Sequence, residues 1–494
     1  MEFLDPRQKR KHNVKLLIGY GLMTTLVIMG TLLMSFLSLG FNFDTKTGSV
    51  IQNGLLFIDS HPESASAIIN GQDKGKTNVR LVMPSGRYGI VLKQDGYRDW
   101  NHDINLEGGS IERLLYPFLF PAELKSEDSD IFSEKPIMAS QSPDRRWLVL
   151  KQPGSPTEFK LIDLNEKTIE TSPILLDKSL LNSNGTTHNY DEVEWSNDNK
   201  HLLLKHTFEG GSEFLVIDRT DAGKSVNLNT KYNWPITDVR LRDKKYDKYY
   251  FHNITNGELV SAELSSETVI AVANGVLKFQ PHGSEQILYV HENKDNKESV
   301  EVILRDQGKN YEIRQIPVSN KYLIDLAQFD GKWYIALGSS TDQKVYIYID
   351  PLKDLTRTNK RSPLPSALLR LNKNIEFLSF SANARFISIQ SGSNFAVYDA
   401  ETVRQFRYDV DLDIDQKYKA KWMDGHRFFV VTQGKMHVFD FDGTNSQELL
   451  NAYNEFYPFF DRDYNNLFTL SPSTTVKDKP ALVFTPMRFD SKQN

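Results

Sequence analysis

A pair of apolar strands separated by a polar turn recurs along most of this chain, and this repeat restricts the fold more than any other feature. Eight copies occur between about residue 135 and the C-terminus, with turns near residues 144, 198, 244, 283, 330, 383, 424 and 463. The mean step of roughly 46 residues is close to the length of one β-propeller blade. A pair of β-sandwiches is the alternative, but the long, regular step favours the propeller.

A third apolar strand follows most of these hairpins. Examples are "EFKLIDLNEK" from Glu158, "EFLVIDRTD" from Glu213 and "FAVYDAET" from Phe395. Three or four strands per repeat is typical of propeller blades. We therefore predict an all-β protein with a seven- or eight-bladed propeller over residues 125–494. We expect eight blades, with the stretch after residue 110 supplying a strand that closes the ring.

The turns of the repeat carry a partial signature. Ser142-Pro143-Asp144 precedes an apolar strand and then a strand that ends in Asp163. This order resembles the degenerate repeats of TolB-like and WD-repeat-like β-propellers, which carry a Ser-Pro-Asp-Gly type of turn. Most other repeats of this chain depart from that turn. The resemblance therefore implies the fold and does not assign the repeats to one family.

The N-terminal region contains a long uncharged stretch. Leu16–Phe43 has no charged residue, and its densest part, Leu16–Leu39, is 24 residues long. As a helix rising about 1.5 Å per residue, this part spans roughly 36 Å, which exceeds a hydrocarbon core of about 30 Å. Basic residues precede it and give residues 1–15 a net charge of +3. The positive-inside tendency places that end in the cytoplasm and the rest outside.

We therefore predict a basic cytoplasmic tail over residues 1–15 and a single transmembrane anchor over residues 16–43. The bulk of the protein is then extracytoplasmic and attached to the cell membrane. A cleaved signal peptide is the alternative, with an apolar region of roughly 7–15 residues and a small-residue cleavage site. The run in this chain is longer and ends in large apolar residues, which favours an uncleaved signal-anchor.

Residues 53–118 alternate short apolar strands with tight turns, of which Asn70-Gly71 is the strongest signal. We predict a separate small β domain over residues 50–120. Its spaced positions resemble the PEGA domain, a β-sandwich-like module of cell-surface proteins, at Leu55, Ile58, Ser60, Pro62, Ala65, Ile69, Asn70, Gly71, Gly75, Thr77, Leu81, Gly86, Tyr88, Ile90, Leu92, Gly96 and Tyr97.

The tetrapeptide that names this family stands here as Pro62-Glu63-Ser64-Ala65. Ser64 replaces the family's glycine, and serine adopts a positive φ at greater cost, so the turn is expected to differ there. The resemblance implies an envelope module with a binding or spacing role and brings no catalytic residues.

Composition excludes several classes of site. The chain has no cysteine, which excludes disulfides, thiolate zinc sites, iron–sulfur clusters and cysteine nucleophiles. Its net charge of −5 leaves −8 for the part after residue 15. A mildly acidic body lacks the basic face that nucleic acids need, so we expect no nucleic-acid partner.

Four carboxylates alternate with apolar residues at Asp409, Asp411, Asp413 and Asp415. As one strand, this segment would place all four on one face. The pattern fits a divalent-cation site or a charged edge strand that discourages aggregation. Same-face residues lie roughly 7 Å apart, too far for all four to share one ion, so the edge strand is favoured.

Other motifs are weaker. Gly71–Thr77 has one residue too few for a phosphate-binding loop and is followed by a strand, so it predicts a hairpin turn. Asp440–Gly443 predicts a plain turn because the later acidic ligand of a calcium loop is absent. His201 and His206 fall on opposite faces of a strand and cannot converge. The basic residues of the stretch 351–373 fit either a solvated connection or a loop for an anionic envelope polymer: Arg357, Lys360, Arg361, Arg370 and Lys373.

We find no G-x-S-x-G, H-E-x-x-H or G-x-G-x-x-G motif, and we predict no catalytic, cofactor-binding or metal-ligating residue and no cofactor. The anchor and the surface-type module favour a membrane-anchored extracytoplasmic binding or scaffold protein of the cell envelope. Its partner would be a protein, a glycan or a cell-wall polymer. The alternative is a propeller-type carbohydrate-active hydrolase or lyase with an active site in its channel.

Overall fold

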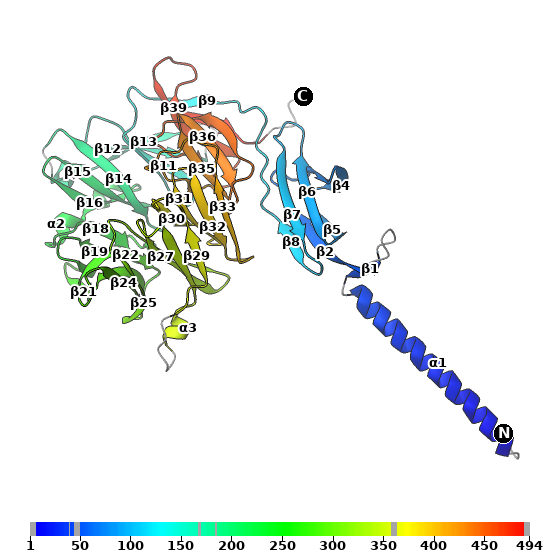
Figure 1. The fold of residues 1–494 in the computed structure, drawn as a ribbon. Coiled ribbons are helices and arrows are strands. Elements are labelled where there is room, and N and C mark those ends of the chain that lie inside the picture. The colour runs from blue at the N-terminus through cyan, green and yellow to red at the C-terminus, as the bar shows by residue number, and fades with distance from the viewer. Residues whose placement is uncertain are drawn as a thin grey trace. The chain divides into compact units, whose positions relative to one another are not determined.

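A computed structural model describes residues 6–38, 40–43, 50–165, 169–182, 185–356 and 363–488. These residues form one long N-terminal helix followed almost entirely by β-strands (Figure 1). The chain divides into two compact units, Met1–Glu123 and Leu124–Arg488. The predicted all-β class is confirmed.

Helix α1 (Pro6–Ser38) is long and apolar enough, from Lys9 to Ser38, to cross a membrane. The predicted anchor extends too far, because the helix ends at Ser38 and not at Phe43. Gly40 adopts a φ of 80°, and its N–H donates to the Leu37 carbonyl at 3.1 Å, which ends the helix. Residues Phe41–Phe43 instead form strand β1, which pairs with Val50–Gln52 of the next strand.

Two four-stranded sheets form the rest of the first unit. One contains β1 (Phe41–Phe43), β2 (Val50–Ile58), β5 (Val79–Pro84) and β8 (Ile111–Leu114). The other contains β4 (Gln72–Lys76), β3 (Ser66–Ile69), β6 (Gly86–Lys93) and β7 (Trp100–Leu106), in that spatial order. Their apolar residues share one core that includes Leu56, Leu92 and Trp100. This is the predicted sandwich-like module.

The turns of this module follow the predicted chemistry. Asn70-Gly71 joins β3 to β4 with φ values of 48° and 79°, so the segment Gly71–Thr77 is a hairpin, as predicted. Ser64 has a φ of 71° and thus keeps the positive φ that the family's glycine would favour. Ser64 therefore adopts this backbone conformation although it is not a glycine.

After residue 124, the described part of the chain forms eight four-stranded antiparallel sheets, the blades of a propeller. Blade 1 contains β10 (Met138–Gln141), β11 (Trp147–Lys151), β12 (Glu158–Asp163) and β13 (Thr171–Leu175). Blade 2 contains β14 (His188–Trp195), β15 (His201–Phe208), β16 (Gly211–Asp218) and β17 (Val226–Asn227). Blade 3 contains β18 (Asp238–Leu241), β19 (Lys248–Asn253), β20 (Glu258–Glu263) and β21 (Val269–Ala273).

Blades 4 to 7 repeat this up-and-down order. Blade 4 contains β22 (Val276–His282), β23 (Gln286–Glu292), β24 (Ser299–Asp306) and β25 (Lys309–Pro317). Blade 5 contains β26 (Tyr322–Phe329), β27 (Lys332–Ser339), β28 (Lys344–Ile349) and β29 (Ala367–Arg370). Blade 6 contains β30 (Phe377–Phe380), β31 (Phe386–Ser391), β32 (Asn394–Asp399) and β33 (Arg404–Asp409). Blade 7 contains β34 (Lys421–Trp422), β35 (Arg427–Thr432), β36 (Lys435–Asp440) and β37 (Gln447–Asn451).

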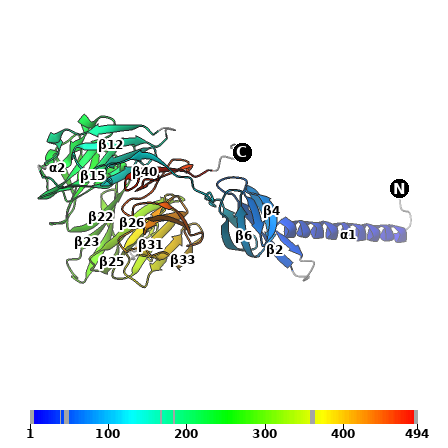
Figure 2. The same cartoon turned by 90° about the horizontal axis from the view of Figure 1, so that it is seen from above.

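Blade 8 closes the ring with strands from both ends of the propeller. It contains β38 (Phe459–Phe460), β39 (Asn466–Pro472), β40 (Pro480–Pro486) and β9 (Glu127–Ile131). Its first three strands are C-terminal, whereas β9 precedes blade 1 and pairs antiparallel with β40. In Figures 1 and 2 the C-terminal strands accordingly return to the start of the propeller. The expectation of eight blades, with a strand after residue 110 closing the ring, is confirmed.

The repeat in the sequence corresponds to one feature of each blade. All eight predicted turns lie between the first and second strands of a blade, and the predicted third strands are third strands. The apolar core lies between neighbouring blades, as where Leu203 and Phe214 of blade 2 pack with Tyr249 of blade 3. Short helical turns link some strands: η1 (Lys178–Leu180), η2 (Ala222–Lys224), α2 (Leu228–Lys231), η3 (Arg242–Lys244) and α3 (Leu352–Leu355).

The aspartate that ends the third strand has a structural role. Asp399 accepts two hydrogen bonds from Arg385, at 2.9 and 2.7 Å. Asp163 accepts three from Arg146, at 3.1, 2.9 and 2.6 Å. In both blades the arginine lies just before the second strand. The Arg–Asp pair therefore ties two neighbouring strands together, which explains the "strand ending in Asp" pattern without assigning it a function.

Candidate functional site

The acidic run over residues 409–415 does not form the predicted strand. β33 ends at Asp409, and Asp411, Asp413 and Asp415 lie in the following loop. The last ladder bond runs from the Val410 N–H to the Ser393 carbonyl, at 3.0 Å. Beyond it the loop buries Val410 and Ile414, so the apolar alternation reflects a packed loop. The interpretations as a one-face cation site and as an edge strand over 409–415 are both wrong.

The other singled-out positions are structural where the described residues include them. His201 contacts Asp198, at 2.6 Å, whereas His206 contacts Glu213, at 2.8 Å, so the two histidines do not converge. Asp440–Gly443 is a turn after β36, as predicted. Arg357, Lys360 and Arg361 of the predicted basic loop lie outside the described residues. Among the described residues, no group of three or more His, Asp or Glu could hold a metal ion.

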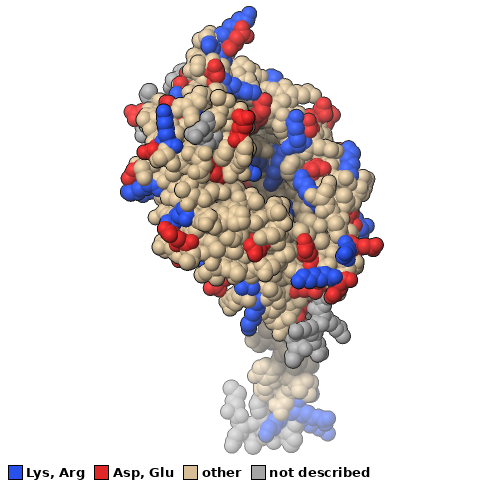
Figure 3. All heavy atoms as spheres, turned by 90° about the vertical axis from the view of Figure 1, so that its left-hand side faces the viewer, with Lys and Arg blue, Asp and Glu red and all other residues tan. Residues whose placement is uncertain are grey.

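Charged side chains from non-neighbouring blades meet around the propeller axis. The charge of Lys421 in blade 7 acts on Glu192 in blade 2, and that of Lys419 acts on Asp325 in blade 5. Blades that are not neighbours approach one another only at the axis of the ring. Figure 3 shows a hollow in one face of the propeller, with Lys and Arg side chains inside it. We use the name channel set for the charged residues that act on one another around the axis: Glu192, Arg240, Lys244, Lys278, Asp325, Lys419 and Lys421.

Two members of the channel set lie beside β-bulges in the innermost strands. The register of β14 shifts between Glu192 and Glu194, and that of β22 shifts between Val276 and Lys278. A bulge re-aims a side chain and often lies beside a binding site. The bulge also separates the roles of the two glutamates, because Glu194 is buried and bonds to the Leu241 N–H and to Lys244. Glu192 remains accessible to water.

The surrounding protein shifts the pKa values of the channel carboxylates. Burial raises the pKa of Asp325 to about 6, although a backbone N–H of Leu326 and the nearby Lys419 and Lys278 oppose the rise. Partial desolvation inside the ring of blades also raises the pKa of Glu192, against the charge of Lys421. The carboxylates are therefore easier to protonate than carboxylates in water.

The channel lysines show the opposite effect. Burial lowers the pKa of Lys419 and of Lys421, and each lies near one channel carboxylate. Lys421 also lies over the Tyr457 ring, with 3.8 Å from Nζ to the ring centroid. Burial lowers the pKa of Lys278, and the like charges of Lys321 and Arg240 add to this effect. The Arg240 Nε is buried without a hydrogen-bond partner among the described residues.

The channel set is basic although the protein is acidic. It contains five bases and two acids, whereas the whole chain has a net charge of −5. These seven residues are spread over five blades, so no linear motif predicts the set. The clearest local signal is a charged residue in an otherwise apolar first strand, such as Asp325 in "LIDLAQF" or Lys278 in "VLKFQ".

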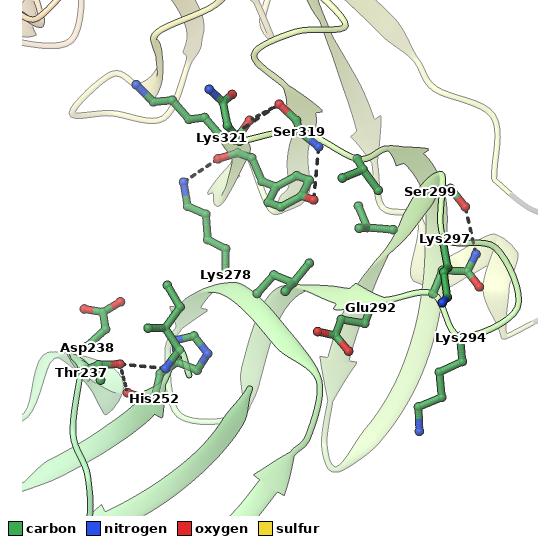
Figure 4. A pocket seen from close by; sticks show the side chains of 17 residues that line it. Thr237, Asp238, His252, Lys278, Glu292, Lys294, Lys297, Ser299, Ser319 and Lys321 are labelled. Atoms are coloured by element: carbon green, nitrogen blue, oxygen red, sulfur yellow. Dashed lines mark hydrogen bonds between the residues drawn. The ribbon is translucent and has the colours of Figure 1, made fainter. Parts of the chain in front are cut away.

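A pocket of about 910 Å³ lies over blades 3 to 5 and shares Lys278 with the channel set (Figure 4). Its walls come from the starts of the innermost strands, including Asp238, Lys278 and Tyr322, and from the β23–β24 loop. Lys278 donates to the Tyr322 carbonyl at 2.6 Å, which links blade 4 to blade 5 across the pocket. The pocket therefore borders the channel set at Lys278.

Comparison with known proteins bears on the first unit. Residues 53–115 match the PEGA domain family. The predicted PEGA domain is confirmed. No match is found among curated proteins.

Several solved structures match the chain at low similarity. An oligogalacturonate lyase in complex with manganese has a TM-score of 0.40 and 11% identity, covering 74% of this chain and 98% of its own. A eukaryotic initiation factor has a TM-score of 0.41 and 12% identity, covering 74% and 90%. The Cps50 (Swd1) β-propeller domain of Myceliophteria thermophila has 0.37 and 12%, covering 67% and 100%. We base no functional argument on these similarities.

Proposed function

We propose that the protein is a membrane-anchored binding protein of the cell envelope, with its PEGA domain and propeller outside the cytoplasm. In this arrangement α1 is the uncleaved anchor, and the basic residues before it stay in the cytoplasm. The propeller recognises an envelope protein, a glycan or a cell-wall polymer at its channel. The PEGA domain, between anchor and propeller in the chain, acts as a spacer or as a second contact.

The observation that carries this proposal is the convergence of charged side chains from five blades on one concave region. Burying charge without a partner is costly, so such sets are usually kept for a ligand or for a specific contact. The apolar helix and the PEGA match support a location in the cell envelope. A tethered protein with a recognition site at the end of its fold suits an immobile envelope partner.

Photocrosslinking in the native envelope tests the proposal. A benzoylphenylalanine at Val318, an exposed residue of the pocket, should form an adduct with an envelope component, whereas one at Leu175 on the outermost strand of blade 1 should not. Intact-mass analysis of the same sample should find residues 1–15 still attached. Equal crosslinking at both positions, or loss of the first forty or so residues, would contradict the proposal.

A channel enzyme is the second candidate, and Asp325 is the observation that favours it. A carboxyl with a pKa of about 6 can exchange a proton near neutral pH, which suits a general acid or base in a hydrolase or lyase acting on a carbohydrate. Asp325→Asn should then abolish the release of reducing ends from a glycan that the wild-type protein degrades. If the wild-type protein binds a glycan and does not cleave it, the enzyme hypothesis is contradicted and the binding function is supported.

A further inference from the structure

The pocket over blades 3 to 5 is lined by more basic than acidic side chains. Four of its side chains are lysines, Lys278, Lys294, Lys297 and Lys321, against the carboxylates of Asp238 and Glu292. Its volume of about 910 Å³ lies within the range of small-ligand sites and is too narrow for a folded partner. A short or chain-like ligand therefore fits it best.

The lysines differ in how far the protein already satisfies them. Lys321 pairs with Glu376 at 3.0 Å, and Lys278 donates to the Tyr322 carbonyl. Lys294 and Lys297 make no hydrogen bond or ion pair with any residue that the structure describes. The second pair is thus available to an incoming anion.

The loop that carries these two lysines is pre-organised. Buried Asn293 accepts hydrogen bonds from the N–H groups of Asp295 and Asn296, at 3.0 and 3.1 Å. Its amide nitrogen donates to the Ser299 hydroxyl at 3.0 Å. A buried side chain therefore fixes the loop between β23 and β24. Because the loop is already ordered, ligand binding loses less conformational entropy and is more favourable.

Positive charge outweighs negative charge at the floor of the pocket. Burial lowers the pKa of Lys278, and the nearby Lys321 and Arg240 add to this effect against the carboxylates of Asp325 and Asp238. An anion placed among these groups would relieve their mutual repulsion, and in a half-enclosed site this attraction is stronger than in water.

The other side chains of the pocket favour an acidic sugar over an acidic peptide as the ligand. Ile254 and Val318 are 65% and 51% exposed at the pocket, and the Tyr322 side chain also lines it. Such surfaces suit the C–H faces of sugar rings. The two carboxylates can accept hydrogen bonds from hydroxyls, whereas they would repel the closely spaced carboxylates of an acidic peptide.

We propose that this pocket binds a segment of an anionic glycan, whose carboxylate or phosphate groups contact the lysines and whose sugar rings contact Tyr322, Ile254 and Val318. This inference rests on the proposed binding function and names the ligand class for the same site. Glycan chains long enough to leave the pocket would continue into the channel, where Lys419 and Lys421 lie.

Binding measurements on the full-length protein in detergent test this inference. The probes are hyaluronan oligosaccharides for carboxylates, poly(glycerol phosphate) for phosphates, chitohexaose as a neutral glycan and poly-L-glutamate as an acidic peptide. We expect at least one of the first two to bind, with affinity that falls as salt rises, and we expect the last two to bind at least tenfold more weakly. Whichever anionic probe binds better identifies the charged group.

Variants locate the binding in the pocket. The double substitution Lys294→Glu and Lys297→Glu should weaken binding at least tenfold, and Lys278→Met should weaken it at constant fold. The same change in net charge at Lys74 and Lys76, on exposed strand β4 of the PEGA domain, should leave the affinity within twofold. Equal losses in the pocket and control variants would overturn the inference.

The remaining outcomes separate this inference from the proposed function. Preferred binding of poly-L-glutamate, or no binding of either anionic probe, overturns the glycan as ligand. An envelope adduct at Val318 would in that case still support the binding function. Glycan binding by a chain that has lost its N-terminal helix in the native envelope would keep the inference and contradict the anchored arrangement.

Discussion

The strand that closes the propeller ring depends on one carboxylate. Asp128 of β9 accepts five hydrogen bonds from the loop after β39: from the Ser473 hydroxyl at 2.7 Å, the Thr474 N–H and hydroxyl at 2.8 and 2.9 Å, and the Thr475 N–H and hydroxyl at 3.0 and 2.5 Å. Burial tends to raise the pKa of Asp128, but these bonds outweigh it and hold the pKa well below its usual value. The carboxylate therefore stabilises the closed ring.

We predict that Asp128→Asn weakens this closure by about 2 kcal/mol. The change leaves Oδ1 but replaces Oδ2, the acceptor for Ser473 and Thr475, with an amide that cannot accept. Bonds to a charged group contribute about 1.5–3 kcal/mol each, and hydroxyls can rotate to other partners, so roughly one bond is lost in net terms. For a propeller of about 365 residues this lowers the melting temperature by roughly 2–3 °C.

Hydrogen exchange gives the more direct measurement, because β9 can open without global unfolding. Amides of Glu127–Ile131 should exchange about 30-fold faster in the variant, since 1.4 kcal/mol corresponds to a factor of ten. The folded-state pKa of Asp128 is depressed, so its contribution is present above the unfolded pKa of about 3.9 and is lost as pH falls below it. The difference between wild type and variant should narrow below about pH 4.

The control for this prediction is Glu127→Gln, on the same strand and exposed to solvent. It should change neither the melting temperature nor the exchange of β9. If Asp128→Asn behaves like this control, the carboxylate does not hold the ring closed and the reasoning fails.

Three further substitutions test the fold and the channel. Gly338→Ala should lower the free energy of unfolding by at least about 2 kcal/mol, because its Cβ would lie 2.1 Å from the Lys344 carbonyl oxygen. Gly211→Ala is the control, since its Cβ meets only ordinary contacts at 3.5 Å. Denaturant unfolding monitored by tryptophan fluorescence compares the two variants. Asp399→Asn should cost about 2–3 kcal/mol by weakening its two bonds to Arg385, and a cost below 0.5 kcal/mol in the same assay would contradict a structural role. Asp325→Asn should stabilise the protein at pH 8 and not at pH 4: the folded pKa of about 6 lies above the unfolded value of about 3.9, so the wild type loses stability as pH rises between them. Melting temperatures of both proteins from pH 4 to 8 check this, and a constant difference would contradict it.

The sequence predicts the blades well because their determinants are local. A hairpin needs an apolar alternation and a turn, and both lie within about fifteen residues, as in "FLSFSANARFISIQ" from Phe377. The same local reasoning fails at residues 409–415. The alternation continues there, but no neighbouring strand remains to pair with it, so Val410 and Ile414 are buried from a loop. Period-2 patterns predict which side chains are buried and do not by themselves predict a strand.

The end of helix α1 shows a related limit. Phe41 and Phe43 extend the uncharged run, and hydropathy alone assigns them to the helix. In the structure a turn at Gly40 ends the helix, and β2 supplies the partner for β1. Strand β2, which competes with the helix for these residues, follows them in the sequence. A hydropathy average over the apolar run therefore cannot reveal this pairing.

The channel set could not be predicted because its members are joined only by the ring. Glu192 and Lys421 belong to blades that are not neighbours, and no motif in the sequence of either blade links the two residues. A closed ring brings one position of every blade to the axis, so single substitutions in separate repeats can create a shared site while the repeats stay intact. This explains how degenerate repeats can keep the fold and still carry a specific charge pattern. It also means that the channel charges stand at exceptions to the repeat, such as Lys278 and Asp325 in otherwise apolar strands.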